Sequence, residues 1–144
     1  MRIRKATLND LAGIMDVVRN SGYPLQHQYS QDTIKFFIDR HIVFVAEEMN
    51  IVGYMVVKEN FRDGSELESI EVDNRFHGKG VADQLIERAE QTVKKLKKNK
   101  LYIKCWTGNL RASSFYEKKG YKKLELIKAY YSDGKDANLW CKEL

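Results

Sequence analysis

Residues 72–89, VDNRFHGKGVADQLIERA, join a predicted strand to a predicted helix through a pair of glycines. Val72 ends an apolar run typical of a strand, and an apolar stripe with helical spacing begins at Val81. Gly78 and Gly80 lie between the two elements. Because glycine costs a helix about 1 kcal/mol relative to alanine, a glycine pair at this place indicates a special requirement of the main chain.

This requirement is either a phosphate site or only a tight turn between strand and helix. A helix N-terminus presents unpaired N–H groups and about half a positive charge, which favour phosphate, and glycines leave the main chain accessible. The spacing excludes a P-loop, and a dinucleotide fingerprint would need glycine at position 83, which is aspartate. The predicted cradle consists of His77, Gly78, Lys79, Gly80, Val81, Ala82 and Asp83.

Length and composition predict a single globular domain over residues 1–144. Hydrophobic residues make up 43% of the chain and charged residues 31%, which is an ordinary balance. No apolar run reaches the ~20 residues of a membrane helix, and the first residues lack the apolar core of a signal peptide. We therefore expect a cytoplasmic protein without a membrane partner.

Neither the cysteines nor the charge pattern indicates a metal or a nucleic acid. Cys105 and Cys141 lie in apolar runs, so we expect buried free thiols, and the three histidines have no metal-ligand spacing. Much of the net charge of +5 lies in KKLKKNK, residues 94–100. These lysines suit the end of a helix, or they attract a phosphorylated ligand or a nucleic acid. They are not interleaved with the aromatic residues that RNA binding requires, so no nucleic acid partner is expected.

Periodicity and turn signals predict an α/β (α+β) domain with a mixed seven-stranded sheet. The expected order is strand–helix–helix–strand–strand–strand–helix–strand–helix–strand–strand. Hairpins in the first half predict antiparallel strands, whereas residues 66–106 should form a parallel crossover. Asp133-Gly134 predicts a closing hairpin, and Thr7 with Asp10 is similar to a capping box. The predicted strands cover 3–6, 42–48, 51–59, 66–72, 101–106, 121–131 and 135–144, and the helices follow Thr7, Ser30, Gly80 and Asn109.

Two segments resemble motifs of the GNAT superfamily of N-acetyltransferases. The glycine stretch resembles its acetyl-coenzyme A motif, Q/R-x-x-G-x-G/A, with Gly80 and Ala82 in place and His77 where glutamine or arginine is usual. NLRASSFYEKKGY, residues 109–121, resembles the family's N-x-x-A-x-x-x-Y-x-x-x-G-F/Y segment. The opening IRKATLNDL is also similar, and AYYSDGKDANLW resembles the closing hairpin of the ribosomal-protein alanine N-acetyltransferase branch.

The resemblance implies the GNAT fold and the transfer of an acetyl group from acetyl-CoA to a primary amine, by direct attack through a tetrahedral intermediate. The acceptor would be a peptide N-terminus, a lysine or a small-molecule amine, and the protein a monomer or homodimer. Main-chain groups of Ile70, Glu71 and Val72 would pair with the pantetheine arm, and the N–H groups of the glycine loop would hold the pyrophosphate. The alternative is a non-catalytic acetyl-CoA-binding sensor of the same fold.

Tyr116 occupies the family's tyrosine position, so the resemblance implies a general acid that protonates the leaving thiolate. Such a group is typically worth ~10²–10⁴ in rate. The competing interpretation is an aromatic residue of the core. Asn109 lies two helical turns before Tyr116 on the same face. It is expected to contact the pantetheine arm, to cap the helix, or to do both.

A base is also useful, because a free alkyl amine has a pKa near ~10.4. Several GNAT enzymes use a glutamate of the fourth strand, and the candidates here are Glu66 and Glu68, with solvated surface charges as the alternative. Strand alternation places both on one face with Ile70, and Glu71 on the other unless a bulge intervenes. The ribosomal alanine branch uses a glutamate of the fifth strand instead, where this chain has Lys104.

The acceptor pocket is expected between the loop from Tyr23 to Tyr29 and the closing hairpin. Tyr130 and Tyr131 lie where peptide-acetylating relatives have paired tyrosines, so the resemblance favours a peptide amine over a small molecule. Packing of one of these two tyrosines in the core is the competing interpretation.

Overall fold

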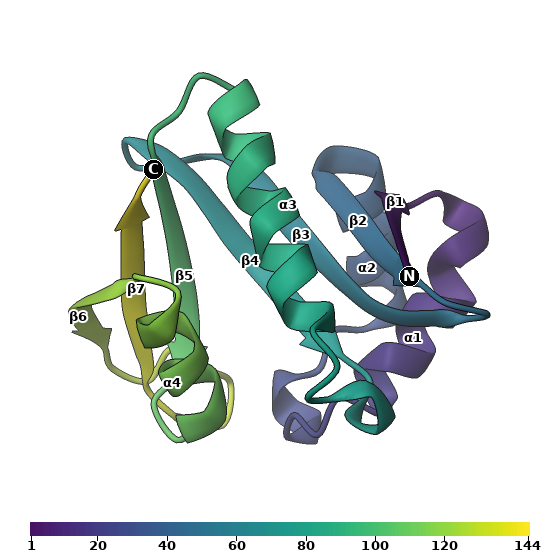
Figure 1. Ribbon diagram of the computed structural model, residues 1–144. Helices are drawn as coiled ribbons and strands as arrows, with labels where there is room; N and C mark the ends of the chain where they lie inside the picture. Colours follow the sequence, from purple (N-terminus) through teal and green to yellow (C-terminus); the bar gives the residue numbers. More distant parts are fainter.

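The computed structural model describes residues 1–144 as a seven-stranded sheet with four α-helices (Figure 1). The predicted fold class and element order are confirmed. The strands are β1 (Arg2–Lys5), β2 (Ile42–Glu47), β3 (Ile51–Phe61), β4 (Gly64–Val72), β5 (Lys100–Trp106), β6 (Lys122–Ile127) and β7 (Ala137–Glu143). The helices are α1 (Leu11–Arg19), α2 (Gln31–Arg40), α3 (Val81–Lys95) and α4 (Leu110–Lys118), with 3₁₀ turns η1 (Leu8–Asp10), η2 (Leu25–His27) and η3 (Asn74–Phe76).

The sheet is covered on both faces, and each face has its own core. The strands lie in the order β1-β2-β3-β4-β5-β7-β6, and only β4 and β5 run parallel, joined by the crossover helix α3 (Figure 1). Side chains of α3 and α4, among them Leu85 and Tyr116, pack in the larger core. Ile14 of α1 and Phe37 of α2 pack in the smaller core on the opposite face. Complete burial of Leu85 contributes about 2 kcal/mol.

The pairing of β4 with β5 is short. The two strands are paired only where Ser65, Glu66 and Leu67 lie beside Leu101, Tyr102 and Ile103, and they diverge beyond that point (Figure 1). From Glu68 to Val72, β4 therefore has a strand partner only on its β3 side. This fork leaves main-chain groups of β4 facing an open space inside the sheet.

A β-bulge lies at the start of the fork. The neighbours Val56 and Val57 of β3 pair with Ser69 and Leu67 of β4, so Glu68 is an extra residue without a partner. One extra residue reverses the alternation of side chains beyond it. The side chains of β4 before and after Glu68 therefore do not follow one continuous alternation.

The bulge corrects the expectation that Glu66 shares a face with Ile70. Leu67 and Ile70 both pack in the α3 core, so Glu66, the neighbour of Leu67, faces α1 and α2. Glu71 faces the same way, because its carboxylate accepts a hydrogen bond from Tyr54 of the smaller core. The α1/α2 face of β4 is thus acidic.

The closing hairpin has shorter strands than predicted. Asp133-Gly134 does form a tight turn, in which the Gly134 N–H donates to the Tyr131 carbonyl at 2.9 Å. The chain also turns before this point, at Ala129, which has a φ of 50° and whose N–H donates to the Asp136 carboxylate at 2.8 Å. Residues 128–136 therefore form a separate connection between β6 and β7.

Two further features bear on the sequence predictions. Cys105 is buried and Cys141 is half-buried, and both are free thiols, so the prediction of burial holds fully only for Cys105.

Among the helices, none combines the length and the apolar character required to cross a membrane.

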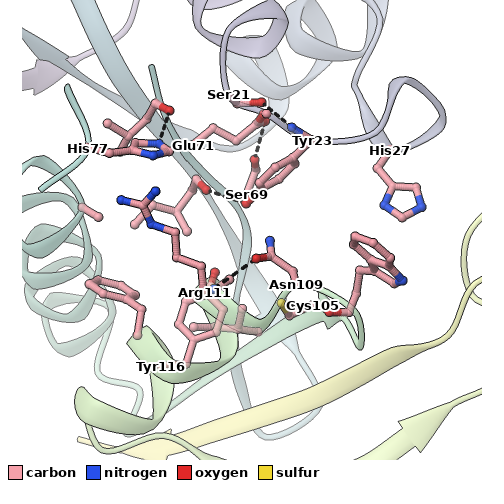
Figure 2. Close-up of a pocket in the computed structure, with 18 of the residues that line it drawn as sticks. Ser21, Tyr23, His27, Ser69, Glu71, His77, Cys105, Asn109, Arg111 and Tyr116 are labelled. Carbon is pink, nitrogen blue, oxygen red and sulfur yellow. Dashed lines mark hydrogen bonds between the residues drawn. The ribbon is translucent and has the colours of Figure 1, made fainter. Parts of the chain in front are cut away.

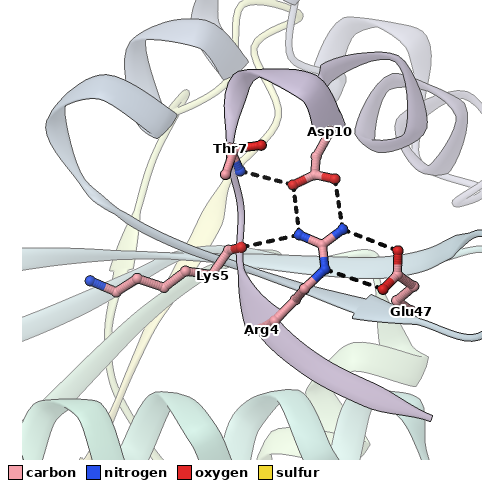
Figure 3. A network of polar contacts seen from close by, with 5 residues as sticks. All are labelled: Arg4, Lys5, Thr7, Asp10 and Glu47. Atoms are coloured by element: carbon pink, nitrogen blue, oxygen red, sulfur yellow. Dashed lines mark hydrogen bonds and ion pairs between the residues drawn. The ribbon is translucent and has the colours of Figure 1, made fainter.

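Arg4 ties β1, η1 and β2 together (Figure 3). Its guanidinium donates to both carboxylate oxygens of Asp10, at 2.9 and 2.8 Å, and to both of Glu47, at 3.2 and 3.1 Å. Asp10 also accepts the Thr7 N–H at 2.8 Å, which is the side chain to main chain bond of the predicted capping box. One buried carboxylate therefore both caps the first turn and anchors the edge of the sheet.

We expect Asp10→Ala to lower the free energy of unfolding by about 1–3 kcal/mol, because it removes a cap and a charged hydrogen-bond partner. Urea denaturation measures this value. Asp39→Ala is the matched control, since Asp39 is an exposed carboxylate at the end of α2. Equal losses in the two variants would contradict the role of Asp10.

The loss should also depend on pH. Hydrogen bonds from Arg4 hold the pKa of Asp10 below its usual value. A lowered pKa contributes stability that is complete above the unfolded-state value of about 3.9 and is lost as the pH falls through the folded-state value. The difference between wild type and Asp10→Ala should therefore shrink in acid.

Candidate active site

A cleft of about 700 Å³ opens at the fork between β4 and β5 (Figure 2). It collects side chains from β4, the glycine loop, α4, the loop after α1 and the β6–β7 connection. Of the residues predicted from the sequence, Glu66, Lys79 and Tyr130 do not line it. The predicted residues that do are Tyr23, Tyr29, Glu68, Ile70, Glu71, Val72, His77, Gly78, Gly80, Val81, Ala82, Asp83, Asn109, Tyr116 and Tyr131.

The glycine loop is shaped by backbone conformation rather than by packing. Gly78 and Gly80 have φ values of 76° and 80°, in the left-handed region, and a Cβ on either would meet no atom within 4 Å. α3 begins at Val81, directly after Gly80. The loop therefore presents bare main chain and a helix N-terminus to the cleft, an arrangement that suits phosphate.

The open edge of β4 presents alternate main-chain groups to the cleft. The Asp73 N–H donates to the Val52 carbonyl of β3 at 2.9 Å, so by alternation the main chain of Glu71 also faces β3. The main-chain groups of Ile70 and Val72 face the fork. These two residues are free to pair with an extended ligand such as the pantetheine arm that the resemblance implies, whereas Glu71 reaches the cleft with its side chain.

His77 closes the glycine loop back onto β4. Its ring Nε2 lies 2.9 Å from the Val72 carbonyl. A carbonyl only accepts, so Nε2 carries the proton and donates it. In this chain the histidine at the usual glutamine or arginine position thus makes a structural contact at the rim of the cleft.

Two tyrosines hold the loop after α1 against β4. The hydroxyl of Tyr29 donates to the Glu68 carbonyl and that of Tyr23 to the Ile70 carbonyl, both at 3.2 Å. Burial raises the pKa of both phenols, so they remain protonated donors. The predicted acceptor wall is therefore attached to the strand that forms the floor of the cleft.

A second contact joins this loop to the β6–β7 connection. The His27 ring stacks on Tyr131 with centroids 3.9 Å apart, and its Nε2 lies 3.1 Å from a carboxylate oxygen of Asp133. We call these three residues the His27 bridge. No sequence pattern indicated the contact between His27 and Asp133, because the two are 106 positions apart in the chain.

The two glutamates predicted as candidate bases are both paired with lysines. Glu66 is 1% exposed and lies 3.1 Å from the Lys104 ammonium; burial is the main cause that raises the pKa of Glu66. Glu68 lines the cleft but lies 3.1 Å from the Lys58 ammonium. Lys104 thus neutralises the fourth-strand carboxylate instead of providing a fifth-strand base.

Tyr116 of α4 and Asn109, the residue directly before this helix, face the cleft (Figure 2). Tyr116 is buried, and burial raises its pKa well above the usual value, so the phenol keeps its proton. The Asn109 side-chain oxygen accepts the Ala112 N–H at 3.1 Å, which confirms the predicted helix cap. Because Asn109 also lines the cleft, its second predicted role remains compatible with the cap.

Cys105 lines the cleft but is a poor nucleophile. Burial raises the pKa of its thiol to about 11, so little thiolate is present near neutral pH. The thiolate is the reactive form. This favours direct attack on a bound acyl donor over an acyl-cysteine route.

Comparison with known proteins agrees with this geometry. The chain matches the Acetyltransferase (GNAT) family over residues 11–121. An N-alpha-acetyltransferase of Saccharolobus solfataricus is 27% identical over 161 residues, covering 99% of this chain and 92% of that relative.

Two solved structures share the fold over nearly the full chain. Ard1 from Thermoplasma volcanium superimposes with a TM-score of 0.88 at 22% identity, covering 99% of this chain and 97% of that one. The ribosomal-protein-S18-alanine N-acetyltransferase from Escherichia coli gives 0.85 at 19% identity, covering 99% and 92%.

The glycine loop can be tested with Gly80→Asn. Asparagine tolerates a positive φ better than other side chains, so the variant adds bulk with limited strain. We expect the Kd for acetyl-CoA, the cofactor of the matched family, to rise about tenfold or more, which corresponds to about 1.4 kcal/mol. Isothermal titration measures it.

Gly134→Asn is the matched control for this variant. Gly134 has a φ of 82° and equally open surroundings, but it does not line the cleft. We expect its acetyl-CoA affinity to equal that of wild type. Unaltered affinity in Gly80→Asn would place the phosphates elsewhere.

Proposed function

The chain belongs to the acetyltransferase (GNAT) family, and we propose that it acetylates the α-amino group at the N-terminus of peptides or proteins. The prediction of a GNAT N-acetyltransferase is confirmed. The protein is therefore an enzyme that uses acetyl-CoA, rather than a sensor of it. The proposal concerns which amine it takes.

The observation that carries the proposal is the aromatic wall on the α1/α2 side of the cleft. Tyr23, Tyr29 and Tyr131 line this side, and the glycine loop lies at the start of α3 on the other side. A donor and an acceptor can thus approach the fork from opposite faces of the sheet. A wall of tyrosines attached to a strand suits an extended peptide better than a compact small amine.

The chemistry of the amine supports the same choice. A peptide α-amine has a pKa of about 7.7–8.0, so about a third of it is neutral near pH 7.5, whereas about 0.1% of a lysine amine is neutral there. An α-amine therefore places a smaller demand on a base. The similarity to N-alpha-acetyltransferases along nearly the whole chain also supports the proposal.

In this proposal each part of the cleft has one role. The glycine loop from His77 to Asp83 binds the pyrophosphate of acetyl-CoA, and the main chain of Ile70 and Val72 aligns the pantetheine arm. One of their N–H groups donates to the oxygen that gains negative charge during attack. Tyr116 donates its phenolic proton to the leaving sulfur.

The acceptor is tested with three substrates. The first is a peptide with a free N-terminus and no lysine, the second is an N-terminally blocked peptide with one lysine, and the third is a small primary amine. Mass spectrometry with acetyl-CoA should show acetylation of the first peptide by far the fastest. Preferred acetylation of the lysine peptide or of the small amine would overturn the proposed acceptor.

Tyr116→Phe tests the acid. We expect kcat to fall by about 10²-fold or more, while the Kd for acetyl-CoA stays within about twofold, because the hydroxyl acts only on the leaving group. Tyr121→Phe is the matched control: Tyr121 is a buried neighbour of Tyr116 whose hydroxyl bonds to Glu90, outside the cleft. Similar kcat values for the two variants would remove Tyr116 from the chemistry.

A further inference from the structure

A buried carboxyl on β4 faces the cleft without a cation. Glu71 is 2% exposed and lines the cleft on its α1/α2 side (Figure 2). One oxygen, Oε2, accepts hydrogen bonds from the Tyr54 hydroxyl and from Ser69 Oγ, the latter at 3.1 Å. The other oxygen, Oε1, has no hydrogen-bond partner although it is buried. An unpaired buried carboxyl oxygen is costly and indicates a functional requirement.

Glu71 differs in its charge environment from the other two glutamates of β4. Lys104 pairs with Glu66, and Lys58 pairs with Glu68. A neighbouring ammonium stabilises the carboxylate form and makes it a weaker proton acceptor. Of the three, only Glu71 has no ammonium beside it to oppose protonation.

The surroundings of Glu71 favour its protonated form. Desolvation is the largest cause that raises its pKa, and no lysine or arginine opposes this rise. The titratable groups that sense the Glu71 charge are Tyr54 of β3 and Tyr23 and Tyr29 of the loop after α1, and all three phenols have raised pKa values. They stay neutral, so Glu71 is the one group of this cluster that can change its charge.

Ser21 completes a site for the additional proton. Its hydroxyl lies beside the Glu71 carboxyl, and its own proton is donated to the Val18 carbonyl at 3.0 Å. The Ser21 oxygen can therefore accept a hydrogen bond from a protonated Glu71 carboxyl. Glu71 is thus accommodated with or without the proton, which is what a transient proton acceptor requires.

Ser69 connects this carboxyl to the open cleft. It lines the cleft, and its Oγ can donate to Glu71, which leaves its lone pairs free to accept from a ligand (Figure 2). Both residues lie on the face of the sheet opposite the core that contains Tyr116. A proton acceptor for the incoming amine and a proton donor for the departing sulfur belong on opposite sides of the reacting carbonyl.

We propose that Ser69 and Glu71 form the relay that removes a proton from the acceptor amine, an assignment that rests on the proposed function for the identity of that amine. Ser69 contacts the amine, and Glu71 acts through it. The ammonium N–H bond breaks as a new O–H bond forms at Ser69. The original Ser69 O–H bond breaks at the same time, and its proton moves to the Glu71 carboxylate. The amine is left neutral with a free electron pair, and the Glu71 proton later returns to water.

The test compares Glu71→Gln with wild type over a range of pH, using the preferred amine of the wild-type enzyme. Glutamine keeps the shape and the Tyr54 and Ser69 bonds but cannot accept the proton. We expect kcat/KM to fall about 10²-fold near pH 7. The deficit should shrink towards tenfold or less near pH 9.5, because solution then supplies neutral α-amine. A merely structural loss would be equal at every pH.

Ser69→Ala and the double variant test the relay. Ser69→Ala should show the same pH-dependent deficit, and combining it with Glu71→Gln should add little, because the two groups act as a unit. Glu90→Gln is the control, since Glu90 also accepts from a tyrosine but lies outside the cleft. We expect it to keep the wild-type profile.

Two outcomes would overturn the relay. One is a wild-type pH profile in Glu71→Gln, with the acetyl-CoA Kd as a check on folding. The other is a pH-dependent deficit that appears in Glu66→Gln instead. Either result leaves the peptide acceptor intact. If wild type instead prefers a small amine, the proposed function fails, and the comparison is made with that amine.

Discussion

The fork between β4 and β5 is the constraint from which the rest of the site follows. Two parallel strands that stay paired for only three residues each leave polar main-chain groups inside the sheet. Such groups must find partners. In this protein the carbonyls of Glu68, Ile70 and Val72 accept hydrogen bonds from Tyr29, Tyr23 and His77, and the main chain of Ile70 and Val72 faces the cleft.

The bulge at Glu68 then determines which side chains of β4 lie on each face of the sheet. Before it, Leu67 packs towards α3, and after it Ile70 does the same, so the alternation is broken by one residue. As a result the acidic side chains of β4 face α1 and α2, whereas Tyr116 approaches from the α3 side. A single extra residue in one strand thereby separates the acidic side chains of β4 from the phenol of α4.

Much of the fold was predictable because its signals are local. The glycine pair, the apolar stripe of α3 and each strand can be recognised within about twenty residues of sequence. The cleft does bring the glycine loop together with Tyr116 and Asn109. The orientation of Glu66 was not predictable. ELESIEV contains no glycine or proline to mark a bulge, and its register depends on β3. The His27 bridge likewise depends on two loops that meet only in the folded chain.

The His27 bridge has a mechanical consequence for the cleft. At one end the cleft is fixed by the paired residues of β4 and β5, and at the other the ring stack and the contact with Asp133 hold its two walls together. The two walls of the cleft are thus linked at both ends rather than at one. Widening it requires the loss of an aromatic stack and a polar contact, so thermal breathing of the two halves is damped before any ligand arrives.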